Sequence, residues 1–132
     1  MAQNDVTEKI LDSFQKVYNQ FGSGQKEKIY ENAIAQDLRK NGFQVLQRWP
    51  IPLYQNGREV GQYYADILVN GNYIVELKTE DQINDSHNRQ VLFYLAASQK
   101  DFGMVLNFGK EPQFKKIQKP QDRSLMSMNK SI

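Results

Sequence analysis

Two short apolar runs that carry charged side chains constrain this chain more than any other feature of its sequence. Ala65–Val69 and Tyr73–Thr79 flank Asn70-Gly71, a pair that favours a tight turn between two antiparallel strands. Buried strands usually exclude charges, yet the first run carries Asp66, and the second carries Glu76 and Lys78. The two-residue period of a strand places Glu76 and Lys78 on the same face. We therefore predict a hairpin in the core whose charged residues form a functional site.

The length of the turn decides whether these charges meet. A plain two-residue turn at Asn70-Gly71 would leave Asp66 on the face opposite to Glu76. A three-residue loop with a left-handed glycine, pairing Leu68 with Asn72, would bring Asp66 onto the face of Glu76. A shared site therefore requires the three-residue loop.

These residue types suit phosphodiester hydrolysis. Two carboxylates can hold one or two divalent ions about 4 Å apart or less, and a nearby lysine can orient water and offset charge on the phosphate. The alternative for Glu76 and Lys78 is a simple ion pair on an exposed sheet face. Asp66 on the adjoining strand, with Glu27 available on a preceding helix, favours the site.

Glu27 belongs to a helix predicted over Gln25–Lys40, whose inward stripe is Tyr30, Ile34 and Leu38. Extending this stripe back by one turn reaches Glu27. A carboxylate on the buried side of a helix requires a partner. The alternative is that Glu27 lies in the first turn, where the helix dipole favours acids and water still reaches the side chain.

The remaining elements complete a mixed sheet with helices packed on it. We expect one domain over residues 1–118, with an N-terminal helix within 1–21 and a mobile tail over 119–132. Asp5 and Glu8 have the spacing of a capping box, and Asp85 or Ser86 is the expected cap of the third helix. The order is α-α-β-β-β-β-α-β, with a further edge strand. The other predicted elements are a helix over 5–20, a strand over 43–51 that continues over 52–55 after a bend, a strand over 59–64, a helix over 86–99, and strands over 103–108 and 114–118.

The third helix offers further polar candidates. His87, Gln90 and Tyr94 share one helical face. Gln90 or His87 could steer a phosphate or the lysine, whereas a solvent-facing polar surface is the alternative for both. Tyr94 is expected to pack at the edge of the core.

Composition narrows the class of protein and of metal. The 132 residues are 39% hydrophobic and 24% charged, as in an ordinary globular domain, and no apolar run approaches the roughly 18 residues that span a membrane. There is no cysteine and one histidine, so a metal here would be oxygen-liganded, such as Mg²⁺ or Mn²⁺. We expect a cytoplasmic location. The net charge of +2 and scattered basic residues permit nucleic-acid binding without requiring it.

Taken together, several segments resemble one known family. The run Gly24–Tyr30 (GQKEKIY) matches the G-x-x-E-x-x-Y signature of the GxxExxY proteins, which belong to the PD-(D/E)XK nuclease superfamily and have a restriction-endonuclease-like fold. The resemblance covers residues 22–118 and continues through WPIPLY (49–54), Tyr64-Ala65-Asp66, IVELK (74–78), His87, Gln90, Tyr94 and LNFG (106–109).

The resemblance implies roles for these residues. Asp66 and Glu76 would be the main metal ligands, with the Leu77 carbonyl contributing and Glu27 approaching the metal directly or through water. Lys78 would position the attacking water. Gln90 would be the additional polar residue from the following helix. Two departures, Gln25-Lys26 before the Glu and Ala65 in place of a proline, remove no ligand.

Two functions are therefore expected from different classes. The first is a Mg²⁺-dependent (or Mn²⁺-dependent) deoxyribonuclease in repair, recombination or phage-related processing, with selectivity for branched or single-stranded DNA as a variant. Cutting both strands with one site per chain would suggest a homodimer. The second is a non-catalytic nucleic-acid-binding or regulatory module on the same fold.

Overall fold

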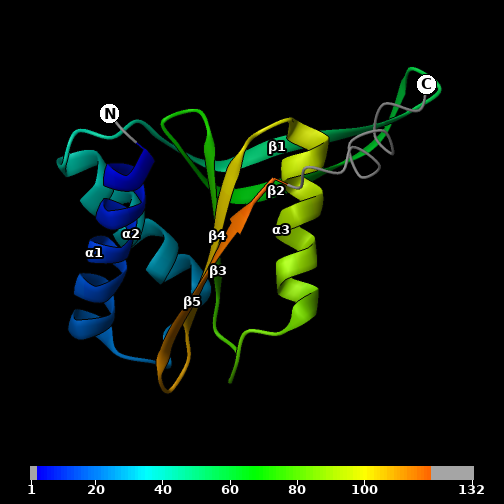
Figure 1. The fold of residues 1–132 in the computed structure, drawn as a ribbon. Helices are drawn as coiled ribbons and strands as arrows, with labels where there is room; N and C mark the ends of the chain where they lie inside the picture. The colour runs from blue at the N-terminus through cyan, green and yellow to red at the C-terminus, as the bar shows by residue number, and fades with distance from the viewer. Residues whose placement is uncertain (1–2, 120–132) are drawn as a thin grey trace.

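The computed structural model describes residues 3–119, which form three helices and one five-stranded sheet (Figure 1). The chain order is α1 (Gln3–Phe21), α2 (Glu27–Lys40), β1 (Val45–Gln55), β2 (Arg58–Val69), β3 (Tyr73–Lys78), α3 (Asp85–Ser98), β4 (Phe102–Phe108) and β5 (Pro112–Gln118). Figure 1 shows α1 and α2 on one side of the sheet and α3 on the other. None of the helices in the described range is long and apolar enough to cross a membrane.

The sheet has the order β1-β2-β3-β4-β5 and contains one parallel pair. Strands β3 and β4 are parallel, and all other neighbours are antiparallel. A parallel pair requires a crossover connection, which α3 provides. The crossover carries α3 back across the sheet, so one helical face lies over the strands that bear the charged residues.

A hydrophobic core lies on each side of the sheet. On one side the buried stripe of α1, which includes Ile10, Phe14 and Val17, packs with α2 against the inner strands. On the other side Val91 and Leu95 of α3 pack against the opposite face. Gly103 of β4 permits this approach, because a Cβ there would lie 2.6 Å from Val91 Cγ1.

The predicted class, a mixed sheet flanked by helices, is confirmed, but there is one strand fewer before α3 than predicted. The segments 59–64 and 65–69 form a single strand, β2, whereas the predicted strand over 43–51 with its continuation over 52–55 is present as β1, which begins at Val45. Pro50 and Pro52 are tolerated because β1 is an edge strand whose outer side needs no hydrogen bonds. The last edge strand is present as β5. The expected mobile tail lies, apart from Lys119, outside the described residues.

Both predicted helix caps were wrong. Helix α1 begins at Gln3, so Asp5 lies in its first turn and does not cap it. The cap of α3 is Asn84, one residue before the predicted candidates. Its side chain accepts hydrogen bonds from the backbone N–H groups of Ser86 and His87. The His87 ring accepts from the Asn84 N–H in return, which completes a capping box.

The central hairpin has the three-residue loop that a shared site requires. Asn70 and Gly71 are both left-handed, with φ of 50° and 74°. The pairing differs by one residue on each strand from the predicted one, because Val69 pairs with Tyr73. The parity is unchanged, so Asp66 comes to the register position opposite Glu76.

Candidate active site

The hairpin opens into a fork at Asp66. Strands β2 and β3 pair only through Ile67, Leu68 and Val69, and beyond them β2 diverges from its neighbour. The N–H of Leu77 on β3 then donates to Asp66 Oδ2 at 2.8 Å. A side-chain carboxylate thus takes the place of a strand carbonyl as acceptor, which fixes Asp66 beside β3.

Glu76 is the most buried charge of the fork, with 3% of its surface exposed. Burial raises the pKa of its carboxyl well above the usual value, and contact with the Asp66 carboxyl raises it further, while Lys78 opposes the shift. Two acids held together away from water disfavour double ionisation. The arrangement is costly for folding alone and suits a cation that neutralises both groups.

Glu27 is the first residue of α2 and lies largely exposed at its N-terminus. Packing beside its carboxyl and the charge of Asp66 both raise its pKa, whereas Lys78 lowers it. These electrostatic interactions place Glu27 close to the fork. The structure therefore brings together all four predicted residues, Glu27, Asp66, Glu76 and Lys78, and the first-turn position proposed as the alternative for Glu27 is compatible with this placement.

Tyr30 explains how α2 is aimed at the fork. Its hydroxyl donates to the Gly22 carbonyl at 2.6 Å and accepts from the Gln25 N–H at 3.0 Å, which closes the loop before the helix. Its ring stacks on Phe108 at the end of β4, with centroids 3.9 Å apart. Gly24 has a φ of 98°, a conformation that other residues rarely adopt. The spacing of Gly24, Glu27 and Tyr30 thus has a physical basis.

Lys78 closes β3 at the register position beside Asn107 of β4. The fully buried Asn107 amide holds the backbone just after the lysine: Oδ1 accepts from the Glu80 N–H and Nδ2 donates to the Glu80 carbonyl, each at 2.9 Å. Within residues 3–119, Lys78 takes part in no ion pair shorter than 4 Å. This finding disfavours a simple Glu76–Lys78 ion pair.

Helix α3 brings two of its three polar candidates to the fork. Gln90 Nε2 donates to the Tyr94 hydroxyl at 3.1 Å. Burial raises the pKa of Tyr94, and the charges of Glu76 and Asp66 raise it further. Tyr94 is only 4% exposed and packs in the core on the α3 side. His87 is engaged in capping α3.

The oxygen ligands of the fork fit a hard divalent cation that needs only one or two carboxylates from the protein. No group of three acidic or histidine side chains in the described part of the chain already converges at metal-binding distances. Mg²⁺, however, keeps several waters and is commonly held by one or two carboxylates. Asp66 and Glu76 supply two, with Glu27 near them. The Leu77 peptide lies at the same point, although the role of its carbonyl as a ligand stays a prediction.

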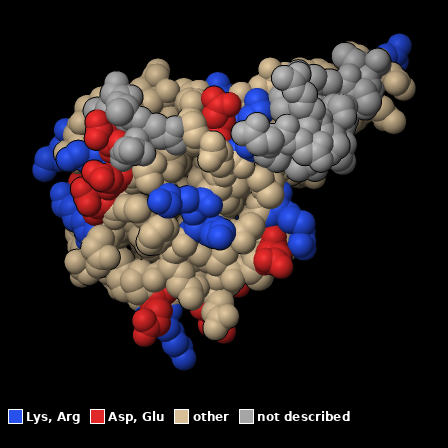
Figure 2. Space-filling view, in the orientation of Figure 1, with Lys and Arg blue, Asp and Glu red and all other residues tan. Residues whose placement is uncertain are grey.

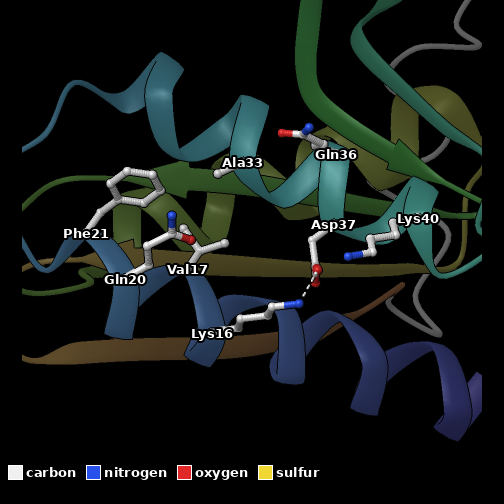
Figure 3. Close-up of a pocket in the computed structure, with 8 residues that line it drawn as sticks. All are labelled: Lys16, Val17, Gln20, Phe21, Ala33, Gln36, Asp37 and Lys40. Atoms are coloured by element: carbon white, nitrogen blue, oxygen red, sulfur yellow. Dashed lines mark hydrogen bonds and ion pairs between the residues drawn. The ribbon is translucent and has the colours of Figure 1, made fainter.

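Two pockets lie outside the fork in the described part of the chain, and the one beside β5, lined by Asn88, Gln113 and Lys115 among others, measures about 410 Å³. A pocket of about 220 Å³ lies between α1 and α2, where Figure 3 shows Lys16 reaching Asp37 across it, with Nζ and Oδ1 2.9 Å apart. This pocket contains none of the fork residues. On the face shown in Figure 2, Lys and Arg side chains are scattered and do not gather into one stripe.

Comparison with known proteins identifies the family. The family model of the PD-(D/E)XK nuclease superfamily matches residues 4–119, so the chain belongs to that superfamily. Four chains of known structure match; one, described as "Crystal structure of SSO0001", is 14% identical, with a TM-score of 0.49, over 95% of this chain and 84% of the other. No curated protein matches. Membership in this superfamily implies a nuclease whose substrate is a nucleic acid and whose cofactor is a divalent metal.

Proposed function

We propose that this protein is a Mg²⁺- or Mn²⁺-dependent deoxyribonuclease of the GxxExxY type, with its active site at the fork between β2 and β3. The observation that carries this proposal is the pairing of Asp66 with the buried Glu76, beside a lysine that forms no ion pair shorter than 4 Å within residues 3–119. A buried acidic pair destabilises a folded protein, so its presence indicates a functional role. Family membership supports the same chemistry.

Each side chain would contribute a defined part. Asp66 and Glu76 would hold the cation, with Glu27 completing the acidic set from α2. Once bound, the cation supplies a Lewis acid that polarises the phosphodiester. Lys78 would orient the attacking water and offset the charge that builds up on the phosphate. Gln90, through its hydrogen bond to Tyr94, would orient polar groups on the α3 side.

Metal binding is the first test. Isothermal titration of the wild type with Mn²⁺ or Mg²⁺ should show binding that Glu76→Ala removes. Glu111→Ala is the matched control, because Glu111 is an exposed acid outside the fork, between β4 and β5. Equal metal binding by all three proteins would contradict the assignment of the fork.

Cleavage is the second test. The wild type should cut at least one substrate from a labelled panel of single-stranded, duplex, flap and four-way-junction DNA, with RNA counterparts as a check on sugar preference. Lys78→Ala should lower the rate about 10²–10³-fold, while Lys115→Ala on β5 should not. Metal binding without cleavage of any substrate would favour the non-catalytic binding module.

A further inference from the structure

The long hairpin of β1 and β2 extends well past the rest of the sheet. Beyond the three pairs with β3, the paired residues between 49 and 65 pair only with each other, from Trp49 with Ala65 to Gln55 with Arg58. We call residues 48–64 the hairpin arm. At about 3.3 Å per residue, its strands reach about 20 Å. Figure 1 shows the arm passing α3 and projecting from the body at the upper right.

The base of the arm packs against the rest of the domain, whereas the remainder of the arm is exposed to solvent. Ile51 is fully buried, and the Tyr63 ring packs against Phe93 and Tyr94 of α3, with centroids 5.9 and 5.6 Å apart. Every residue from Tyr54 to Tyr64 is exposed. A two-stranded hairpin is only marginally stable alone in water. A long hairpin with an exposed surface therefore indicates a binding surface for another molecule.

Aromatic rings and cations lie together on both faces of the arm. Tyr63 and Tyr64, adjacent on β2, leave 45% and 37% of their area exposed on opposite faces. The Arg48 guanidinium carbon lies 4.1 Å from the Tyr64 ring centroid, and Lys100 Nζ lies 5.4 Å from that of Trp49. A ring beside a cation is the combination by which proteins bind single-stranded nucleic acid, with bases stacked on rings and phosphates held by cations.

The arm leads directly into the fork. Tyr64 is two residues from Asp66 on β2. A nucleic-acid strand with a base stacked on Tyr64 would therefore bring its backbone toward the acidic pair.

Other occupants fit less well. A second copy adding a strand to the free edge of β1 would meet Pro50 and Pro52, which lack the N–H groups that strand pairing needs. Duplex DNA hides its base faces and is held mainly through phosphates. The arm has a net charge of only +1, from Arg48 and Arg58 against Glu59. Unpaired bases, in contrast, can stack on the exposed aromatic rings of the arm.

We propose that the hairpin arm binds a single-stranded stretch of nucleic acid and guides it into the fork. This inference rests on the proposed nuclease function, because it names the substrate class of that site. Tyr64 is the stacking residue. Arg48, whose side chain lies over the Tyr64 ring, contacts the phosphate beside the stacked base.

The test measures binding in EDTA, where no metal supports cleavage. The probe is a fluorescently labelled oligothymidine of about 16 nucleotides, the upper end of a typical single-strand site, compared with a duplex of equal length. Trp49, the single tryptophan of the sequence, lies in the arm, so its emission reports local binding independently. The full-length chain is used throughout, with circular dichroism to verify the fold of each variant.

The arm predicts a specific pattern among variants. Tyr64→Ala should weaken binding of the oligothymidine about tenfold, within the range reported for removing one stacked base. Tyr64→Phe keeps the ring and loses only the hydrogen bond from Gln62, so it should bind like the wild type. Arg48→Ala should weaken binding and lower the salt dependence by about 0.7 in the log–log slope. Phe114→Ala, an exposed aromatic on β5, is the matched control.

Each outcome decides between the claims. Equal binding by Tyr64→Ala and the wild type, or a preference for the duplex, would overturn the arm proposal. So would a loss in Tyr64→Phe as large as in Tyr64→Ala. Binding with the predicted pattern but no cleavage with any metal would refute the nuclease function and leave the arm intact. If the wild type cleaves DNA but the arm variants bind the oligothymidine as the wild type does, the arm proposal is refuted and the nuclease function stands.

Discussion

The hydroxyl of Tyr30 provides a sharp test of how the fold positions the site. Tyr30→Phe keeps the ring stacked on Phe108 and removes two hydrogen bonds, to the Gly22 carbonyl and from the Gln25 N–H. Both backbone groups lie at the surface edge, where water can replace the lost partner in part. We therefore expect a loss of about 1–2 kcal/mol in the free energy of unfolding, which for a domain of this size lowers Tm by roughly 3–8 °C.

The activity should fall by more than the loss of stability explains. At temperatures where Tyr30→Phe is fully folded, the loop before α2 is looser and Glu27 is less well fixed. Small displacements of a catalytic group can cost up to about 10²-fold in rate, and we expect about a tenfold loss of cleavage. The control is Tyr73→Phe, which loses a 3.0 Å hydrogen bond with Thr7 at the far end of β3. It should lose stability without losing activity.

Thermal unfolding by circular dichroism and single-turnover cleavage at one temperature measure both quantities. Two results would refute the reasoning. One is wild-type cleavage by a destabilised Tyr30→Phe, which would mean that the loop does not position Glu27. The other is an equal loss of activity in Tyr73→Phe, which would mean that general loosening, not position, limits the rate.

Three further predictions concern the supports of the site and the helix pair. Gly109→Ala should destabilise the protein by about 1–3 kcal/mol in urea unfolding, because the new Cβ would lie 2.5 Å from the Glu80 carbonyl oxygen; wild-type stability would show that the turn can move. Asn107→Ala should cost a similar amount by leaving both Glu80 backbone groups unpaired, and should lower cleavage; unchanged cleavage would exclude a positioning role. Burial is the largest single influence on Asp37 and opposes its ionisation, but the hydrogen bond and charge of Lys16, together with Ser13 and Lys40, lower its pKa below the ordinary value. The pair should thus contribute about 0.5–1 kcal/mol at neutral pH, lost as pH falls through that lowered pKa; Asp37→Asn should match the wild type only in acid, and a constant difference would contradict this.

The hairpin at the centre of the site could be predicted because its signals are local. Asn70-Gly71 between two apolar runs defined the turn, and the two-residue period defined the faces. The choice between a two- and a three-residue loop then followed from the requirement that Asp66 and Glu76 share a face. The predicted residue pairing was still off by one on each strand, because backbone twist at the loop is not encoded in hydrophobic periodicity.

The supports of the site could not be predicted, because they join distant parts of the chain. The Asn107 side-chain amide forms hydrogen bonds with the backbone of Glu80, which is 27 residues away in sequence. Tyr30 stacks on Phe108 across the domain. Neither contact leaves a periodic signal. The length of β2 was also missed, because the segments 59–64 and 65–69 were predicted as two strands, yet pairing with β1 continues through both.

The fork also explains why charges survive on core strands. If Glu76 and Lys78 existed only to satisfy each other, the shortest arrangement would be a direct ion pair, and Lys78 forms none within residues 3–119. Asp66 is partly satisfied by the Leu77 N–H, a backbone group that strand divergence leaves unpaired. The Asp66 backbone and Lys78 favour ionised Glu76, yet burial and the Asp66 carboxyl outweigh them and raise its pKa. A bound cation would remove the cost of that burial, so Mg²⁺ or Mn²⁺ should raise the Tm of the wild type but not of Glu76→Ala.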